Sequence, residues 1–396
     1  MQNHPADQEP RRVLGSFFAP KSQNTPTWEQ RKLGEMVDVC SGMDYKHLSE
    51  GDIPVYGTGG YMLSVNKALS YDRNAVGIGR KGTIDKPYIL KAPFWTVDTL
   101  FYAIPKDSKN IDFTFDVFQK VDWKKKDEST GVPSLSKIAI NETSISTPSK
   151  LEQERIGSFF RNLDTLITLH QRKYEKLVNI KKSMLDKMFP KNGASVPEIR
   201  FKGFTDLWEQ RKLGELVEIG DIDHRMPETV ADGIPYLMTG DFVGTNELNF
   251  DGTKMISEED YCQLSQKIKP EKGDILFARY ASVGAARYVD FTRKFLISYS
   301  CAIIKKSKKI NSKYLYHFIT SGKVQQQIKL EINTGSQANI GIDSMKNHIV
   351  VSMPPLEEQT KIADALSNLD HLITLHQRKL EKLQNIKKSC LEKMFV

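Results

Sequence analysis

The chain contains two internal repeats, and this duplication limits its architecture more than any other feature. The segment WEQRKLGE stands at 28–35 and again at 208–215. A longer segment, LDTLITLHQRKYEKLVNIKKSMLDKMF at 163–189, returns as LDHLITLHQRKLEKLQNIKKSCLEKMF at 369–395, with five differences in 27 positions. Repeats of this length indicate that one structural unit has been copied. The sequence therefore predicts the order domain, helix, domain, helix.

The longer repeat has the spacing of a helix with one apolar edge. Bulky residues recur at alternating intervals of three and four, except where Lys181 and Lys387 interrupt them. This spacing is typical of the seam of a two-helix coiled coil, and Pro148 and Pro354 stand before each helix. The seam residues that we predict are Leu163, Ile167, His170, Tyr174, Leu177 and Met184, with Leu369, Ile373, His376, Leu380, Leu383 and Met394.

The two seam histidines occupy equivalent positions. We expect His170 and His376 to be packed and hydrogen-bonded, with a metal site or a proton switch as the less favoured alternative. No other feature suggests a bound metal, because the four cysteines lack metal-ligand spacing.

The segments between the helices, 36–147 and 216–352, are rich in glycine, proline, aromatic and β-branched residues. Such a composition is typical of short strands and turns, and a helix is also expected near 311–330. We predict an α/β (α+β) fold: two β-rich domains joined by a long antiparallel two-helix coiled coil, with a pseudo-twofold internal repeat. The expected parts are a tail at 1–27, a first domain at 28–147, a helix at 148–190, a linker at 191–207, a second domain at 208–352 and a helix at 353–396.

Composition and missing motifs narrow the class of protein. The formal net charge of +8 mildly favours a polyanionic partner. No apolar run is long enough for a membrane span, and the N-terminal residues lack the basic start and apolar run of a signal peptide, so we expect a cytoplasmic protein. The GxGxxG pattern at 77–82 is followed by Thr-Ile-Asp-Lys-Pro, which does not start a helix. Because nucleotide-, metal- and serine-hydrolase motifs are also missing, we expect no enzyme activity and no cofactor.

Near-identical helices and divergent domains suggest one scaffold that presents two different binding surfaces. Two helices of roughly 38 residues are each about 57 Å long, and one turn of DNA is about 34 Å. Such a spacer could set two domains on sites about one to one and a half turns apart. This arrangement predicts a bipartite target with a fixed gap.

The motifs, in their order, resemble the specificity (S) subunits of type I restriction-modification systems, over essentially the whole chain after Trp28. Besides WEQRKLGE, the matching segments are PVYGTGG at 54–60, IPYLMTGDF at 234–242, GDILFARYASVG at 273–284, TGSQANIGI at 334–342, and PPLEEQTKIADALSNLD at 354–370 with its partner at 148–164. The resemblance implies two target-recognition domains, each reading half of an asymmetric double-stranded DNA sequence. It also implies that the helices bind two methyltransferase subunits and that a motor-nuclease subunit joins the full complex. The methyl donor and ATP would belong to those partners.

Base reading needs polar side chains at the end of a loop that enters a groove. In the first domain Arg80 and Lys81 stand between glycines, and in the second Arg279 and Tyr280 stand at the corresponding place. We predict that these four residues contact DNA, with a basic turn facing solvent as the alternative.

A second group of candidates follows. Gln337 and Asn339 could pair with adenine edges and Ser336 with phosphate; the first domain offers Ser134 and Ser136 at the counterpart segment. Less favoured are Tyr56 and Thr58, with Tyr236, Thr239 and Asp241, for which a turn-forming role is at least as plausible.

Three alternatives stay open. Residues 1–27 depart from the lead-in VPEIRFKGFTDL that precedes Trp208, and could be a disordered tail or a displaced helix start. The chain could be a coiled-coil scaffold that ignores DNA. It could also be a nuclease or methyltransferase, which the missing catalytic motifs argue against.

Overall fold

A computed structural model describes residues 28–106, 110–191, 194–335 and 337–395. The tail predicted at 1–27 and the candidate Ser336 therefore lie outside the described residues. The chain divides into unit 1, Met1–Leu169 with Leu380–Val396, and unit 2, His170–Lys379. Each unit combines one globular domain with parts of both long helices. These units therefore do not test the domain boundaries that the sequence predicts along the chain, and those boundaries stay a prediction.

Among its described residues, unit 1 contains three small sheets, and the four-stranded one is antiparallel throughout. This sheet has the order β2 (Val37–Ser41), β8 (Leu100–Pro105), β5 (Ala75–Gly79) and β6 (Tyr88–Leu90). The others are β4 (Gly60–Val65), β3 (Glu50–Gly57) and β7 (Trp95–Thr96), and the pair β1 (Glu29–Lys32) and β9 (Ser144–Thr147). The helices are α2 (Leu33–Met36), α3 (Ile111–Lys120) and α4 (Lys137–Asn141), with a 3-10 turn at Trp123–Lys126.

Unit 2 repeats this plan, which shows that the duplication includes the divergent domains. Its four-stranded sheet has the order β11 (Ile219–Gly220), β19 (Cys301–Ile304), β16 (Ile275–Ala278) and β17 (Ala286–Tyr288). The other sheets are β15 (Lys254–Ile256), β12 (Ile234–Leu237) and β18 (Leu296–Ile297); β10 (Glu209–Lys212) and β20 (Val350–Met353); and β13 (Phe242–Val243) and β14 (Glu247–Leu248). The helices are α6 (Leu213–Leu216), α7 (Glu258–Leu264), α8 (Ser312–Ile319), α9 (Gly322–Leu330) and α10 (Ile342–His348), with a 3-10 turn at Thr239–Asp241.

The WEQRKLGE repeat forms the same local structure in each unit. Its EQRK part is an antiparallel strand, β1 or β10, and its leucine opens a one-turn helix. The backbone N–H of Leu33 donates to the carbonyl of Thr143 at 2.8 Å, and that of Leu213 donates to Ile349 at 2.9 Å. Both leucines are fully buried, so this repeat anchors the first strand of each domain to its core.

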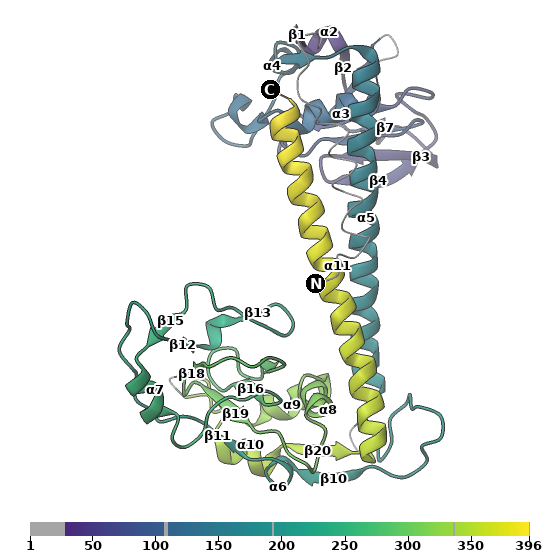
Figure 1. Ribbon diagram of the computed structural model, residues 1–396. Helices are drawn as coiled ribbons and strands as arrows, with labels where there is room; N and C mark the ends of the chain where they lie inside the picture. The colour runs from purple at the N-terminus through teal and green to yellow at the C-terminus, as the bar shows by residue number, and fades with distance from the viewer. Residues whose placement is uncertain (1–27, 107–109, 192–193, 336, 396) are drawn as a thin grey trace. The chain divides into compact units, whose positions relative to one another are not determined.

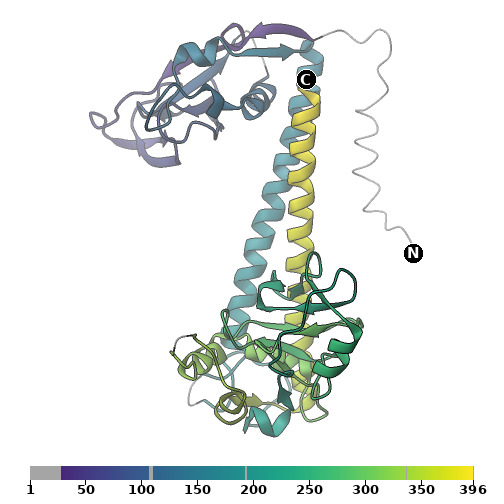
Figure 2. The same ribbon diagram turned by 90° about the vertical axis from the view of Figure 1, so that its left-hand side faces the viewer.

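The long helices α5 (Lys150–Lys187) and α11 (Leu356–Met394) lie side by side within each unit (Figures 1 and 2). In unit 1, Lys387 Nζ lies 2.5 Å from Asp164 Oδ1. In unit 2, Lys181 pairs with Asp370, and the Nδ1 atoms of His170 and His376 lie 2.8 Å apart. Because higher numbers in α5 face lower numbers in α11, the helices run antiparallel. All twelve predicted seam residues are buried or half-buried. Among the described residues, no helix is long and apolar enough to cross a bilayer.

A buried ionisable group from each globular domain faces the lysine–aspartate pair of the seam. In unit 1 this group is Asp116 of α3, and burial raises its pKa to about 9. In unit 2 it is His317 of α8, whose pKa burial lowers to about 3 and whose Nδ1 lies 3.9 Å from Asp370 Oδ2. Both groups are therefore neutral near pH 7. In each unit the charges of the seam lysine and aspartate therefore offset each other, and the neutral group beside them adds no further charge.

His317 makes the stability of unit 2 sensitive to acid. Its folded pKa of about 3 lies below the ordinary value of 6.5, so the unfolded chain binds a proton first as the pH falls. Stability that is present above pH 6.5 should be lost between pH 6.5 and about 3, by up to about 1.4 kcal/mol per pH unit for this group. Urea titrations at several pH values should show a shallower acid loss in His317→Gln. The exposed His371 supplies the control, since His371→Gln should keep the full slope; equal slopes in both variants would contradict the assignment.

Candidate nucleic-acid interface

In unit 1 the loop after β5 lies against the segment before α4. Lys81 and Ser134 form an isolated antiparallel bridge, and the N–H of Leu135 donates to the carbonyl of Arg80 at 3.0 Å. Both candidate segments of the first domain thus meet at one place. They line a surface pocket of about 390 Å³, together with Ser41, Phe101, Glu128, Leu135, Ser136 and Lys137.

The side chains at this pocket include three cations and one anion, Glu128, a balance that favours a polyanion. Arg80, Lys81 and Lys137 are exposed. The Arg80 guanidinium lies 5.7 Å from the ring centroid of Phe101 and donates to the Asp98 carbonyl at 3.4 Å. Three cations on one surface can contact phosphates, and arginine can also make paired hydrogen bonds to a base edge.

Unit 2 brings its candidates together in the same way. Tyr280 and Asn339 form an isolated antiparallel bridge, and the N–H of Ile340 donates to the carbonyl of Arg279 at 3.1 Å. Gln337 is exposed, Tyr280 and Asn339 are half-buried, and the Asn339 side chain donates to the Gln337 carbonyl at 2.9 Å. The loop after β16 and the segment before α10 therefore correspond to the two segments of unit 1.

The expectation that Arg279 is presented to DNA needs correction. Arg279 is buried, its Nη1 forms an ion pair with Asp221, and its Nε donates to the Ile340 carbonyl at 3.0 Å. Burial by itself would raise the pKa of the Asp221 carboxyl, but the hydrogen bond with His224 and the charges of Arg279 and Lys267 lower it below its ordinary value. The guanidinium is thus committed to the protein interior, because breaking a buried pair leaves an uncompensated charge.

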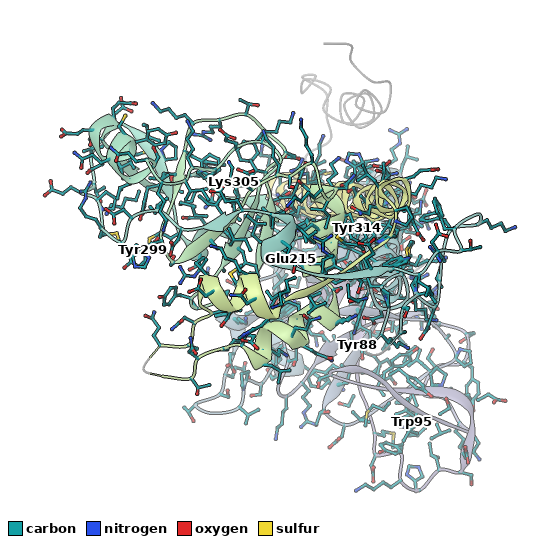
Figure 3. The ribbon with its side chains drawn as sticks, turned by 90° about the horizontal axis from the view of Figure 1, so that it is seen from below. Tyr88, Trp95, Glu215, Tyr299, Lys305 and Tyr314 are labelled. Carbon is teal, nitrogen blue, oxygen red and sulfur yellow. The ribbon has the colours of Figure 1, made fainter. Side chains whose placement is uncertain are left out.

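Sequence reasoning missed Asp221 and its surroundings. Asp221 directly follows β11, and its Oδ2 lies 2.8 Å from His224 Nε2. The His224 ring stacks on Tyr299, labelled in Figure 3, with centroids 4.9 Å apart. The signal was available in the repeat: the sixth residue after WEQRKLGE is Ser41 in the first copy and Asp221 in the second.

Three further candidates have roles in the fold. Ser136 is the N-cap of α4, where its hydroxyl accepts from the Ala139 N–H at 3.0 Å and donates to Glu128 at 3.1 Å. Tyr236 is fully buried, so it cannot reach a ligand. Asp241 accepts from the Met238 N–H at 2.7 Å and closes a turn. Asp241 thus has the turn-forming role given as its alternative, Tyr236 is too enclosed for the contact predicted for it, and the Ser136 hydroxyl already caps a helix.

The positive φ of Ala281, +57°, marks the same turn in both units. The equivalent residue of unit 1 is Gly82, with φ +87°. Residues with a Cβ seldom adopt this conformation, so the turn after the candidate residues is maintained in unit 2 against a local cost. The loop has kept its backbone path although its side chains differ.

Comparison with known proteins extends these similarities. The family model described as "Type I restriction modification DNA specificity domain" matches residues 26–179 and 205–385. The type I restriction enzyme MjaVIII specificity subunit of Methanocaldococcus jannaschii is 26% identical over 280 residues, which are 68% of this chain and 65% of that protein. The putative type I restriction enzyme MjaX specificity subunit of the same organism is 25% identical over 268 residues, 65% of this chain and 60% of that protein. The chain thus spans less than two thirds of these curated relatives.

A solved structure has the same fold. The type I restriction-modification system S subunit from M. genitalium superposes with a TM-score of 0.65, covering 96% of this chain and 98% of that one, at 15% identity. The matched segments, the duplicated fold and the family model agree. The chain belongs to the family of type I restriction-modification DNA specificity domains, and it carries two of them.

Proposed function

We propose that this chain is a sequence-reading subunit: each globular domain reads one half of a bipartite, asymmetric DNA sequence. The observation that carries this proposal is the repeated meeting of two loops, with Lys81 against Ser134 in one unit and Tyr280 against Asn339 in the other. Equivalent backbone with different side chains is what two readers of different half-sites require. Family membership supports the same role.

The helices α5 and α11 are proposed to set the gap between the half-sites. They contain 38 and 39 residues, hence about 57 Å and 59 Å of helix. Selection from a random-sequence duplex pool by the chain with its methyltransferase subunit should yield two short motifs at one fixed spacing. Removing one base pair from the spacer should lower affinity at least about tenfold, because one domain must then leave its half-site. Indifference to that deletion would contradict a fixed gap.

We further propose that the catalytic work belongs to partner chains: two methyltransferase subunits and, in the full complex, a motor-nuclease subunit. The methyl donor and ATP would bind to them, and the whole complex would act in the cytoplasm. Exposed leucines on the helices support a partner. In unit 1, Leu166 and Leu169 are 43% and 45% exposed, and in unit 2 their repeat equivalents Leu372 and Leu375 are 40% and 39% exposed.

Charged substitution of these leucines should separate partner binding from folding. The variant Leu166→Glu with Leu169→Glu is expected to weaken methyltransferase association at least about tenfold, since truncating apolar anchors at an interface costs 1–2 kcal/mol or more. Sedimentation of the mixed subunits measures the association. Glutamates at the exposed Thr165 and Thr168 of the same helix form the control pair. Equal association of both variants would place the partner elsewhere.

A further inference from the structure

The loop arginines of the two units have the same backbone environment. The N–H of Arg80 donates to Thr99 at 2.8 Å, and the N–H of Arg279 donates to Ser300 at 2.9 Å. One side-chain contact is also shared. Nη1 of Arg80 lies 3.4 Å from the carbonyl oxygen of Asp98, and Nη1 of Arg279 lies 3.4 Å from that of Tyr299. The two residues are therefore structural equivalents.

Their side chains nevertheless differ in exposure. Arg80 is exposed and lines the pocket of unit 1, whereas Arg279 is 6% exposed. The difference lies at the end of the first strand of each four-stranded sheet. Asp221 supplies a buried carboxylate that pairs with Arg279, whereas Ser41 lines the same pocket as Arg80 and carries no charge.

The residues on the neighbouring strand also differ between the two units. Ser41 pairs across β2 and β8 with Phe101, and the Phe101 ring lies beneath the Arg80 guanidinium. In unit 2 the residue equivalent to Phe101 is the small Ala302, because Ala302 pairs with Phe277 of β16 as Phe101 pairs with Ile78 of β5. An alanine there leaves room for the arginine to turn inward to a carboxylate. In unit 1 the Phe101 ring lies beneath the guanidinium, and Ser41 lines the same pocket as Arg80, so a carboxylate at position 41 would lie beside the arginine.

We infer that this strand-end position determines which arginine is available to DNA: Ser41 leaves Arg80 free to contact the duplex, and Asp221 withdraws Arg279 from it. The inference rests on the proposed function, because it assumes that these loops face DNA. A guanidinium must be free to make paired hydrogen bonds to guanine or to bind a phosphate. The half-site of unit 2 is then read by other side chains, among which Tyr280 and Gln337 are accessible.

Chemical labelling tests the withdrawal without DNA. Treatment of the full chain with an arginine-selective dicarbonyl, followed by peptide mass spectrometry, should modify Arg80 at least about tenfold faster than Arg279, because a buried, paired guanidinium is shielded. Ser41→Asp should slow the labelling of Arg80 more than the uncharged, equally sized Ser41→Asn does. Equal labelling of Arg80 and Arg279 in the native chain would overturn the inference.

Half-site selection then tests the consequence for reading. With the methyltransferase subunit present, the native chain and its variants select from a random-sequence duplex pool. Ser41→Asp should lose at least about tenfold of the base preference in the half-site of unit 1, Ser41→Asn should lose less, and the preference of unit 2 should persist. Adding Ser41→Asp to Arg80→Ala should cause no further loss. A further loss in that background would show that the new carboxylate repels phosphates, and would overturn the inference. Failure of the native chain to select any bipartite sequence would instead contradict the proposed function, with the labelling result unaffected.

Discussion

Replacing Asp221 by leucine is expected to lower the free energy of unfolding by about 3–5 kcal/mol, the cost typical of removing one partner of a buried ion pair. The side chains of Asp221 and Arg279 are each 7% exposed, so water cannot compensate the charge that remains on Arg279. The loss should be confined to unit 2. Urea denaturation combined with hydrogen exchange in β16 and β19 measures both its size and its location.

A second substitution should restore the stability that Asp221→Leu removes. The double variant Asp221→Leu with Arg279→Met removes both charges and keeps the volume, so it should regain most of the lost stability. Ser41→Ala is the matched control at the equivalent strand end of unit 1, and it should change stability by no more than about 0.5 kcal/mol. A small effect of Asp221→Leu, similar to that of Ser41→Ala, would mean that the pair is not buried in solution.

The second large effect concerns DNA. Arg80→Ala is expected to lower the preference for the correct base in one half-site by about 10- to 100-fold, which corresponds to about 1–3 kcal/mol. The other half-site should keep its preference, and it serves as the internal control for folding. Arg80 is exposed and held by a ring contact and one long hydrogen bond, so its loss removes little from the fold.

Lys137 separates base reading from general attraction. It is exposed beside the same pocket, and Lys137→Ala should weaken binding to all sequences alike and reduce the salt dependence by about one phosphate contact. If Arg80→Ala also weakened both half-sites equally, Arg80 would be a phosphate contact and not a base reader. Selections and salt titrations of the two variants, made side by side, distinguish these cases.

The helices were predictable because their evidence is local. A period of three and four residues determines which face of a helix is apolar, and every seam residue predicted from it is buried or half-buried. The same pattern treated Lys181 and Lys387 as interruptions. Their partners, Asp370 and Asp164, stand on the opposite helix, so no spacing within one helix could reveal them.

The candidate site was predictable only in part. Glycines and small residues identified the two loops, and the duplication showed that they correspond. The loops meet through bridges such as Lys81 with Ser134, which join residues far apart in the chain. Exposure of the arginines depended on a third segment, at Ser41 and Asp221, which contributes through the sheet. A residue's availability is decided by neighbours that its own motif does not contain.

The lysine–aspartate pairs of the helices also oppose misalignment. If α5 slipped along α11 by one turn, Lys181 and Lys387 would each face a different side chain, and a largely enclosed ammonium would lose its counter-charge. Polar residues at single positions of a coiled coil specify alignment in this way, at some expense in stability. Each unit has its own pair. If one helix were lengthened or shortened by a few residues, the two helices would therefore not pack together again in the same alignment. Such changes of length should be tolerated only where both lysine–aspartate pairs can form again.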